Sequence, residues 1–203
     1  MSYALAALVC SAGVVLSACS PTQPSEISTP APENSAPASQ ETPSPSPSPS
    51  ASDDAFAPEI GWEMGNSQKP HTPGSVLLAH DFRVGVHDDY YRVVIEFVGE
   101  GEPGWIVSWK DEAVEMGRGD PLPIPAGNVL DVHIEGTTMP VLEAQAEQYY
   151  SGPADKRLDE KAIAWFDGSF EGQTHVAISS DIERPYRIFT LEDPQRVVID
   201  LQR

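Results

Sequence analysis

Hydrophobic and polar residues alternate with a period of two along most of the chain after residue 75. Eight runs have this alternation or a dense β-branched composition, and turn formers such as Asp88-Asp89 and Asp167-Gly168 separate them. The runs are Val76–Val86, Tyr91–Val98, Trp105–Lys110, Val129–Glu135, Ala162–Phe166, His175–Ser179, Tyr186–Leu191 and Arg196–Leu201. About eight short strands with frequent turns predict an all-β sandwich or barrel. Val141–Tyr150 is rich in Glu, Ala and Gln and predicts a short helix.

An internal repeat refines this prediction. Phe82–Phe97 aligns without a gap on Tyr186–Leu201, 104 positions later, and both segments contain a Val-Val-Ile core. Any two β-hairpins share part of such a pattern. Because this match extends over both strands and the turn, we interpret it as a duplicated half-domain, with the two hairpins related by an approximate two-fold rotation.

The second copy also predicts a strand register. A four-residue loop from Glu192 to Gln195 places Ile188 opposite Ile199 on one face and Arg187 opposite Asp200 on the other. A slip by one residue would mix the two faces, so the hydrophobic pattern supports this pairing.

The same register in the first copy sets Val84 opposite Ile95 and Arg83 opposite Glu96. A shorter loop, of His87 and Asp88 alone, would oppose two arginines across the strands. We therefore expect the longer loop, with opposite charges paired in both copies.

The start of the chain is apolar and uncharged from Ala4 to Ala18. This stretch is shorter than the roughly 20 residues of a transmembrane helix. The sequence Leu16-Ser17-Ala18-Cys19 reads as a lipobox, the signal for lipoprotein processing, whereas plain secretion requires a small residue in place of Leu16. No Lys or Arg precedes the apolar run, which is a departure from the usual pattern. We predict a lipoprotein signal peptide over 1–18 and lipidation of Cys19, which anchors the protein to the outer face of the cytoplasmic membrane.

Residues 19–58 differ sharply in composition from the rest. They contain half of the 20 prolines, with Ser, Thr and Ala between them, and they carry five acidic residues and no basic one. Such a segment predicts a disordered, extended linker after the lipidated cysteine. Because Cys10 leaves with the signal peptide and Cys19 is acylated, we expect no disulfide and no thiol ligand in the domain that follows.

Residues 59–203 are long enough for one domain with a hydrophobic core. The chain has 31 acidic and 12 basic residues, and only five of the acidic ones lie in the linker, so this domain carries a net charge of about −14. Nucleic-acid binding needs a basic surface, so the charge excludes a nucleic-acid partner.

Several segments of this domain resemble one family. Arg83-Val-Gly-Val-His-Asp88, Pro103-Gly104-Trp105, Phe170-Glu-Gly172 and the closing Pro185–Asp200 region resemble the actinobacterial lipoproteins with an AMIN-like domain, over roughly Leu77 to Leu201. The resemblance implies a β-sandwich of two related sheets, an envelope location and peptidoglycan as a ligand. It transfers no binding residue.

The sequence contains no recognised catalytic motif, so we expect no enzymatic activity. The five histidines, His71, His80, His87, His133 and His175, have no metal-ligand spacing along the chain, so we expect neither a metal nor another cofactor. Acidic pairs in loops, such as Asp111-Glu112, lack the order of an EF-hand and predict solvated loop charge.

Aromatic residues are the better candidates for a binding surface, because their rings combine apolar area with a polar edge. The candidates are Tyr90, Tyr91, Trp105, Trp109, Tyr149 and Tyr150, and the two tryptophans also fit a position in the core. Two functions remain open. The domain is a non-catalytic module that binds a cell-wall glycan or peptide, or it is an interaction or assembly lipoprotein whose partner is another envelope protein.

Overall fold

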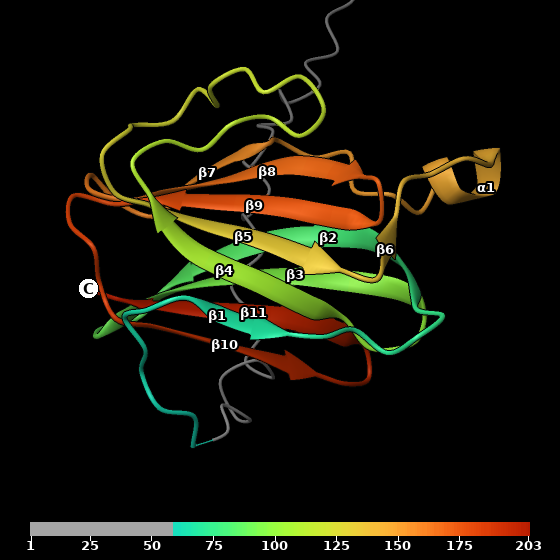
Figure 1. Cartoon of the computed structure of the whole chain (residues 1–203), viewed down its shortest axis with the longest axis horizontal. Helices are drawn as coiled ribbons and strands as arrows, with labels where there is room; N and C mark the ends of the chain where they lie inside the picture. The colour runs from blue at the N-terminus through green and yellow to red at the C-terminus, as the bar shows by residue number, and fades with distance from the viewer. Residues whose placement is uncertain (1–58) are drawn as a thin grey trace, which may run out of the picture. The chain divides into compact units, whose positions relative to one another are not determined.

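A computed structural model describes residues 59–203; the predicted signal peptide, Cys19 and the linker fall outside the described residues. Eleven strands and one short helix follow one another in this part of the chain (Figure 1). They are β1 (Ser67–Lys69), β2 (Val76–Val86), β3 (Tyr90–Glu100), β4 (Gly104–Lys110), β5 (Val129–Glu135), β6 (Thr137–Thr138), α1 (Glu143–Ala146), β7 (Asp155–Arg157), β8 (Ile163–Phe170), β9 (Gln173–Ser179), β10 (Tyr186–Leu191) and β11 (Gln195–Gln202).

The strands form two sheets, and the predicted β-sandwich is confirmed. One sheet has six strands in the order β1-β4-β5-β9-β8-β7, and the other has five in the order β10-β11-β3-β2-β6. Every pairing is antiparallel except that of β2 with β6. Between residues 59 and 203, no helix has the length and apolar character that crossing a membrane requires.

All eight predicted strands are present, and three short ones were not predicted. β1, β6 and β7 contain only two or three residues each, too few to show an alternation of hydrophobic and polar positions. The predicted helix over Val141–Tyr150 is reduced to the single turn α1, which has no buried residue to hold a longer helix against the core.

The hydrophobic core lies between the two sheets. Alternate residues of each strand point into it, as Leu130, Val132 and Ile134 do in β5. From the opposite sheet, Ile95 and Ile199 enter the same cluster, and all five side chains are fully buried. The period-two pattern of the sequence therefore identifies the face of each strand that packs inward.

The two repeated hairpins lie side by side in the five-stranded sheet. β3 pairs with β11, and Val94 lies opposite Val198, the residue that corresponds to it in the repeat. Pairing of equivalent residues in antiparallel strands is the arrangement that a two-fold axis through this point produces. The register therefore supports the duplicated half-domain.

The register of the second hairpin is confirmed, and that of the first is wrong by two residues. Ile188 pairs with Ile199 as predicted, whereas Val84 pairs with Val93 rather than with Ile95. The turn of the first hairpin lies one residue earlier in the repeat, with Val86 opposite Tyr91 where the second hairpin has Leu191 opposite Arg196, and the backbone N–H of His87 donates to the carbonyl of Tyr90 across it. An even shift keeps every side chain on its predicted face.

The residues beside the two turns differ, although their positions are equivalent in the repeat. Tyr91 corresponds in the repeat to Gln195, a polar residue beside the second turn, but its ring is only 2 % exposed and belongs to the core. Both registers place Tyr91 on the inward face of β3, because they differ by an even number of residues. The predicted ion pair survives the shift, since Arg83 still contacts Glu96 diagonally at 3.0 Å.

The outer face of the five-stranded sheet carries a buried ion-pair cluster. The carboxylate of Asp200 accepts hydrogen bonds from Arg92 at 2.7 and 2.8 Å and from Arg187 at 2.8 Å. Asp200 is fully buried, and the Arg187 guanidinium lies 4.7 Å from the ring centroid of Trp62. Beside this cluster, Val94, Val198 and Phe189 form a small hydrophobic cluster with Ile60 packed on it.

The first described residues connect the two sheets. Glu63 forms an antiparallel bridge with Tyr186 of β10, with backbone hydrogen bonds of 2.7 and 2.8 Å. A few residues later, β1 pairs with the edge of the other sheet, with Gln68 opposite Ile106 of β4. The phenolic O–H of Tyr186 donates to the carbonyl of Gly65 between these two points.

Candidate functional site

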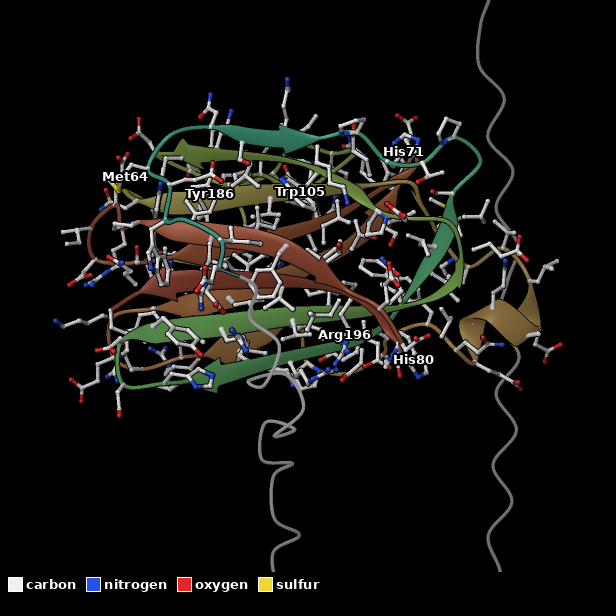
Figure 2. All side chains as sticks on the ribbon, turned by 90° about the horizontal axis from the view of Figure 1, so that it is seen from below. Met64, His71, His80, Trp105, Tyr186 and Arg196 are labelled. Carbon is white, nitrogen blue, oxygen red and sulfur yellow. The ribbon has the colours of Figure 1, made fainter. Side chains whose placement is uncertain are left out.

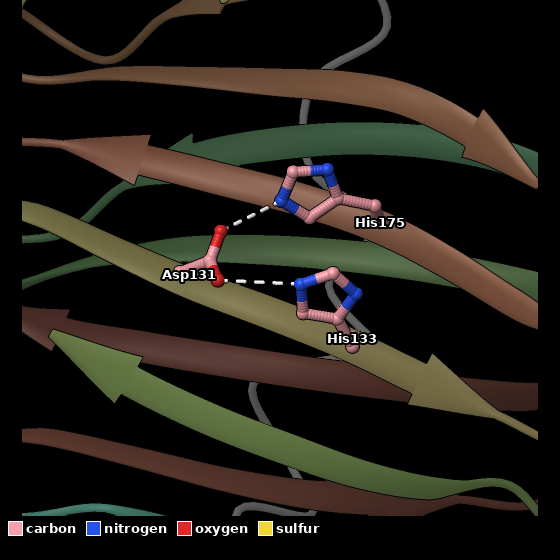
Figure 3. A group of neighbouring side chains, drawn as sticks. All are labelled: Asp131, His133 and His175. Carbon is pink, nitrogen blue, oxygen red and sulfur yellow. Dashed lines mark hydrogen bonds and ion pairs between the residues drawn. The ribbon is translucent and has the colours of Figure 1, made fainter. Parts of the chain in front are cut away.

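Two neighbouring strands of the six-stranded sheet bring an aspartate and two histidines together. In β5, Asp131 and His133 are two residues apart, so both side chains lie on the face opposite the core. His133 pairs directly with His175 of β9, and the two imidazole rings stack with centroids 4.5 Å apart at 7°. We call Asp131, His133 and His175 the Asp-His-His cluster; Figure 3 shows both imidazoles directing a nitrogen at the carboxylate.

The carboxylate of Asp131 contacts both imidazoles. Its Oδ1 lies 2.8 Å from Nε2 of His175, and its Oδ2 lies 3.2 Å from Nε2 of His133. The His175 side chain is 1 % exposed, whereas that of His133 is 27 % exposed. The cluster thus contains one fully buried histidine and one histidine that is partly exposed to solvent.

A second carboxylate holds His175 from the other side. Asp167 lies at a β-bulge of β8, where the sequence predicts a turn, and its Oδ2 is 3.0 Å from Nδ1 of His175. The backbone N–H of Met116 donates to the same oxygen at 2.8 Å. The loop between β4 and β5 therefore covers the cluster and fixes the position of Asp167.

This environment changes two ionisation equilibria. Burial alone would lower the pKa of His175, but hydrogen bonds to Asp131 and Asp167 outweigh it and raise the pKa to about 9. Burial would likewise raise the pKa of Asp131, but its hydrogen bonds to His133 and His175 outweigh burial and hold the pKa well below its usual range. In the absence of another ligand, His175 is therefore an imidazolium between two carboxylates at neutral pH.

Two open pockets lie on the same sheet. One, of about 560 Å³, is lined by Met116, Gly117, Phe170, Glu171 and Gln173. The other, of about 380 Å³, is lined by Gln68, Lys69, Pro70, Trp105, Ile106 and Glu135. Glu135 and Gln173 are directly paired between β5 and β9, one row beyond the paired histidines. The pockets therefore flank one end of the sheet's outer face.

The structure does not collect the six aromatic candidates on one surface. Tyr90 lies on the outer side of the five-stranded sheet, where it stacks on His87 at 4.3 Å. The other five pack into or against the core between the sheets: Tyr91, Trp105, Trp109, Tyr149 and Tyr150. Trp105 alone among the six also lines one of the two pockets described above; Figure 2 labels it together with His71.

Sequence reasoning missed the Asp-His-His cluster. His133 and His175 are 42 residues apart, so the spacing of histidines along the chain does not indicate that they share a site. One signal was present, since Asp131 and His133 are separated by a single residue in a predicted strand and must share a face. The partner strand β9 could not be assigned from the sequence.

The sequence was compared with known proteins. A protein-family model for the AMIN-like domain matches residues 77–203. A search of curated proteins gives no match. The matched segment begins in β2 and includes both repeated hairpins and the Asp-His-His cluster. The chain belongs to the AMIN-like domain family.

Proposed function

We propose that this protein is an actinobacterial cell-envelope lipoprotein whose AMIN-like domain binds a cell-wall component, peptidoglycan or another glycan, without catalysing a reaction. Membership of the AMIN-like family is the observation that carries the proposal. The lipid on Cys19 would hold the domain at the outer face of the cytoplasmic membrane. The Leu16-Ser17-Ala18-Cys19 sequence and the proline-rich segment after it support this part of the proposal.

We place the ligand on the outer face of the six-stranded sheet, between the two pockets. This surface combines Phe170, 37 % exposed, and Ile106, 42 % exposed, with the polar side chains of Glu135 and Gln173. Sugar rings have apolar faces and hydroxyl edges, and an aromatic ring beside carboxylate and amide groups complements both. Of the aromatic residues favoured from the sequence, only Trp105 borders one of the pockets, and most of its side chain is buried in the core.

Co-sedimentation with purified cell-wall sacculi tests this proposal. We expect the full-length chain to sediment with the sacculi and Phe170→Ala to sediment substantially less. Ile182→Ala is the matched control, because Ile182 is an exposed hydrophobic residue, 56 % accessible, that lines neither pocket. Equal loss of binding in both variants would refute the proposed surface.

Absence of sedimentation by the unaltered chain would refute wall binding altogether. The protein would then be better explained as an interaction or assembly lipoprotein of the envelope. Cross-linking in intact cells would identify its protein partner.

A further inference from the structure

We propose that Asp131, His133 and His175 bind a divalent first-row transition-metal ion such as Zn²⁺, with Asp167 as the residue that orients His175. The three proposed ligands line neither of the two pockets, and the site is tested without any wall material. Four observations support it: ligand type, ligand geometry, orientation of the buried imidazole, and charge.

The ligand types fit such an ion. Imidazole nitrogen and carboxylate oxygen are the donors that Zn²⁺ takes in sites with three protein ligands and one open position. His133 is partly exposed, so water or an external ligand can reach the fourth position. Residues 59–203 contain no cysteine, so no thiolate in the predicted domain can compete with the Asp-His-His cluster for the metal ion.

The ligand atoms are close to the required separation. One ligand atom from each residue lies within 4.8 Å of the other two, and Asp131 contacts His175 through Oδ1 at 2.8 Å and His133 through Oδ2 at 3.2 Å. A tetrahedral ion with bonds of about 2.0–2.1 Å needs ligand atoms roughly 3.3 Å apart. His133 is the most exposed of the three side chains, so it has the most freedom to adjust its position when an ion binds.

Asp167 presents the correct nitrogen of His175. A metal-bound histidine commonly donates its other ring N–H to a carboxylate, which fixes the tautomer and the ring plane. Nδ1 of His175 has this partner in Asp167, and the Met116 N–H fixes Asp167 in turn. Nε2 of His175 therefore points at Asp131 and His133, where the ion would lie.

The charge of the cluster also favours a dication. Asp131 and Asp167 are two carboxylates in a poorly solvated layer, with side chains only 11 % and 5 % exposed. A divalent ion bound between Asp131 and the two imidazoles would balance the charge of both carboxylates.

Calorimetric titration with Zn²⁺ tests the site. The full-length chain would carry Cys10→Ala and Cys19→Ala, because free thiolates also bind Zn²⁺. After removal of metal with a chelator, we expect binding of one equivalent, an increase in Tm with added Zn²⁺, and release of protons seen as a dependence of the heat on the buffer.

His133→Ala is the decisive variant, because this partly exposed side chain can be removed with the least damage to the fold. Loss of an outer partner of a metal-bound histidine weakens metal affinity by roughly 10–100-fold, so we expect loss of the ligand itself to weaken it by about 100-fold or more. Asp167→Asn should weaken it by roughly 10–100-fold. His80→Ala is the control, since His80 is exposed and bonds only to the carbonyl of Gln148.

The outcomes separate a metal site from a purely structural cluster. If Zn²⁺ binds the parent and His80→Ala equally and His133→Ala much more weakly, with the folded circular dichroism spectrum retained, the proposal stands. If the parent binds no Zn²⁺, or if His133→Ala binds as tightly as the parent, the proposal is refuted. In that case the Asp-His-His cluster is a structural polar network.

Discussion

Replacing Asp200 with alanine should be among the most destabilising single changes on the outer face of the five-stranded sheet. Asp200 is fully buried and bonds to two arginines, and the side chain of Arg92 is itself only 3 % exposed. Removal of one partner from a buried ion pair typically costs about 3–5 kcal/mol, because the remaining charge stays in a poorly solvated place. We expect a cost in this range for Asp200→Ala.

The repeat supplies a matched control. Glu96 corresponds to Asp200 in the first copy, and it pairs with Arg83, which corresponds to Arg187. These two side chains are 20 % and 24 % exposed, and Arg83 keeps a second carboxylate, Asp81, at 2.9 Å. Partly solvated pairs contribute roughly 0–1 kcal/mol, so Glu96→Ala should cost no more than about 1 kcal/mol.

Urea denaturation at pH 7, analysed by linear extrapolation, measures both free energies of unfolding. The difference between the two variants should persist at high salt, because buried charges are screened much less than exposed ones. If Asp200→Ala costs no more than Glu96→Ala, the claim that burial distinguishes these two equivalent pairs is refuted.

Three further predictions concern the anchor, the domain boundary and the core. Cys19→Ala should abolish labelling by a fatty-acid analogue and release processed protein to the medium; unchanged labelling would show that lipid is attached elsewhere. Residues 59–203 alone should give a β-type circular dichroism spectrum and one cooperative melt, whereas a disordered spectrum would mean that the preceding segment completes the core. Ile95→Ala and Ile199→Ala should each lower the free energy of unfolding by roughly 2–5 kcal/mol, since both side chains are fully buried; a cost below 1 kcal/mol for either would contradict its place in the core.

The sequence predicts the long strands well because their inward residues recur at every second position. The limits of β2, β5 and β10 agree with the predicted runs to the residue. The edge strands β1 and β7 are defined by hydrogen bonds to a neighbour rather than by their own three-residue sequences. Such strands cannot be recognised before the neighbour is known.

The first hairpin shows why a register is harder to predict than a strand. Its charges were consistent with the predicted pairing, but exposed ion pairs are weak and tolerate a diagonal arrangement. Burial of Tyr91 does not decide between the two registers either, because an even shift leaves its ring on the core side. A repeat therefore predicts equivalent strands more safely than equivalent loops.

The Asp-His-His cluster could be predicted only in part. Alternation along β5 places Asp131 and His133 together, but the other members come from β9 and from a bulge in β8. His175 and Asp167 reach Asp131 and His133 only through the order and register of the strands. That order and register depend on the whole core. When residues from several strands of a sheet form a site, their spacing along the sequence does not identify the site.

The bridge between Glu63 and Tyr186 and the short strand β1 have a mechanical consequence. Tension applied to the chain ahead of residue 59 reaches these edge contacts first, because the chain passes through them before it enters the core strands. β11, at the other end of the chain, is flanked by neighbours on both sides. Under such load, the segment from Glu63 to Lys69 would therefore detach before the sandwich opens, which adds length to the chain ahead of β2 while the remaining strands stay paired.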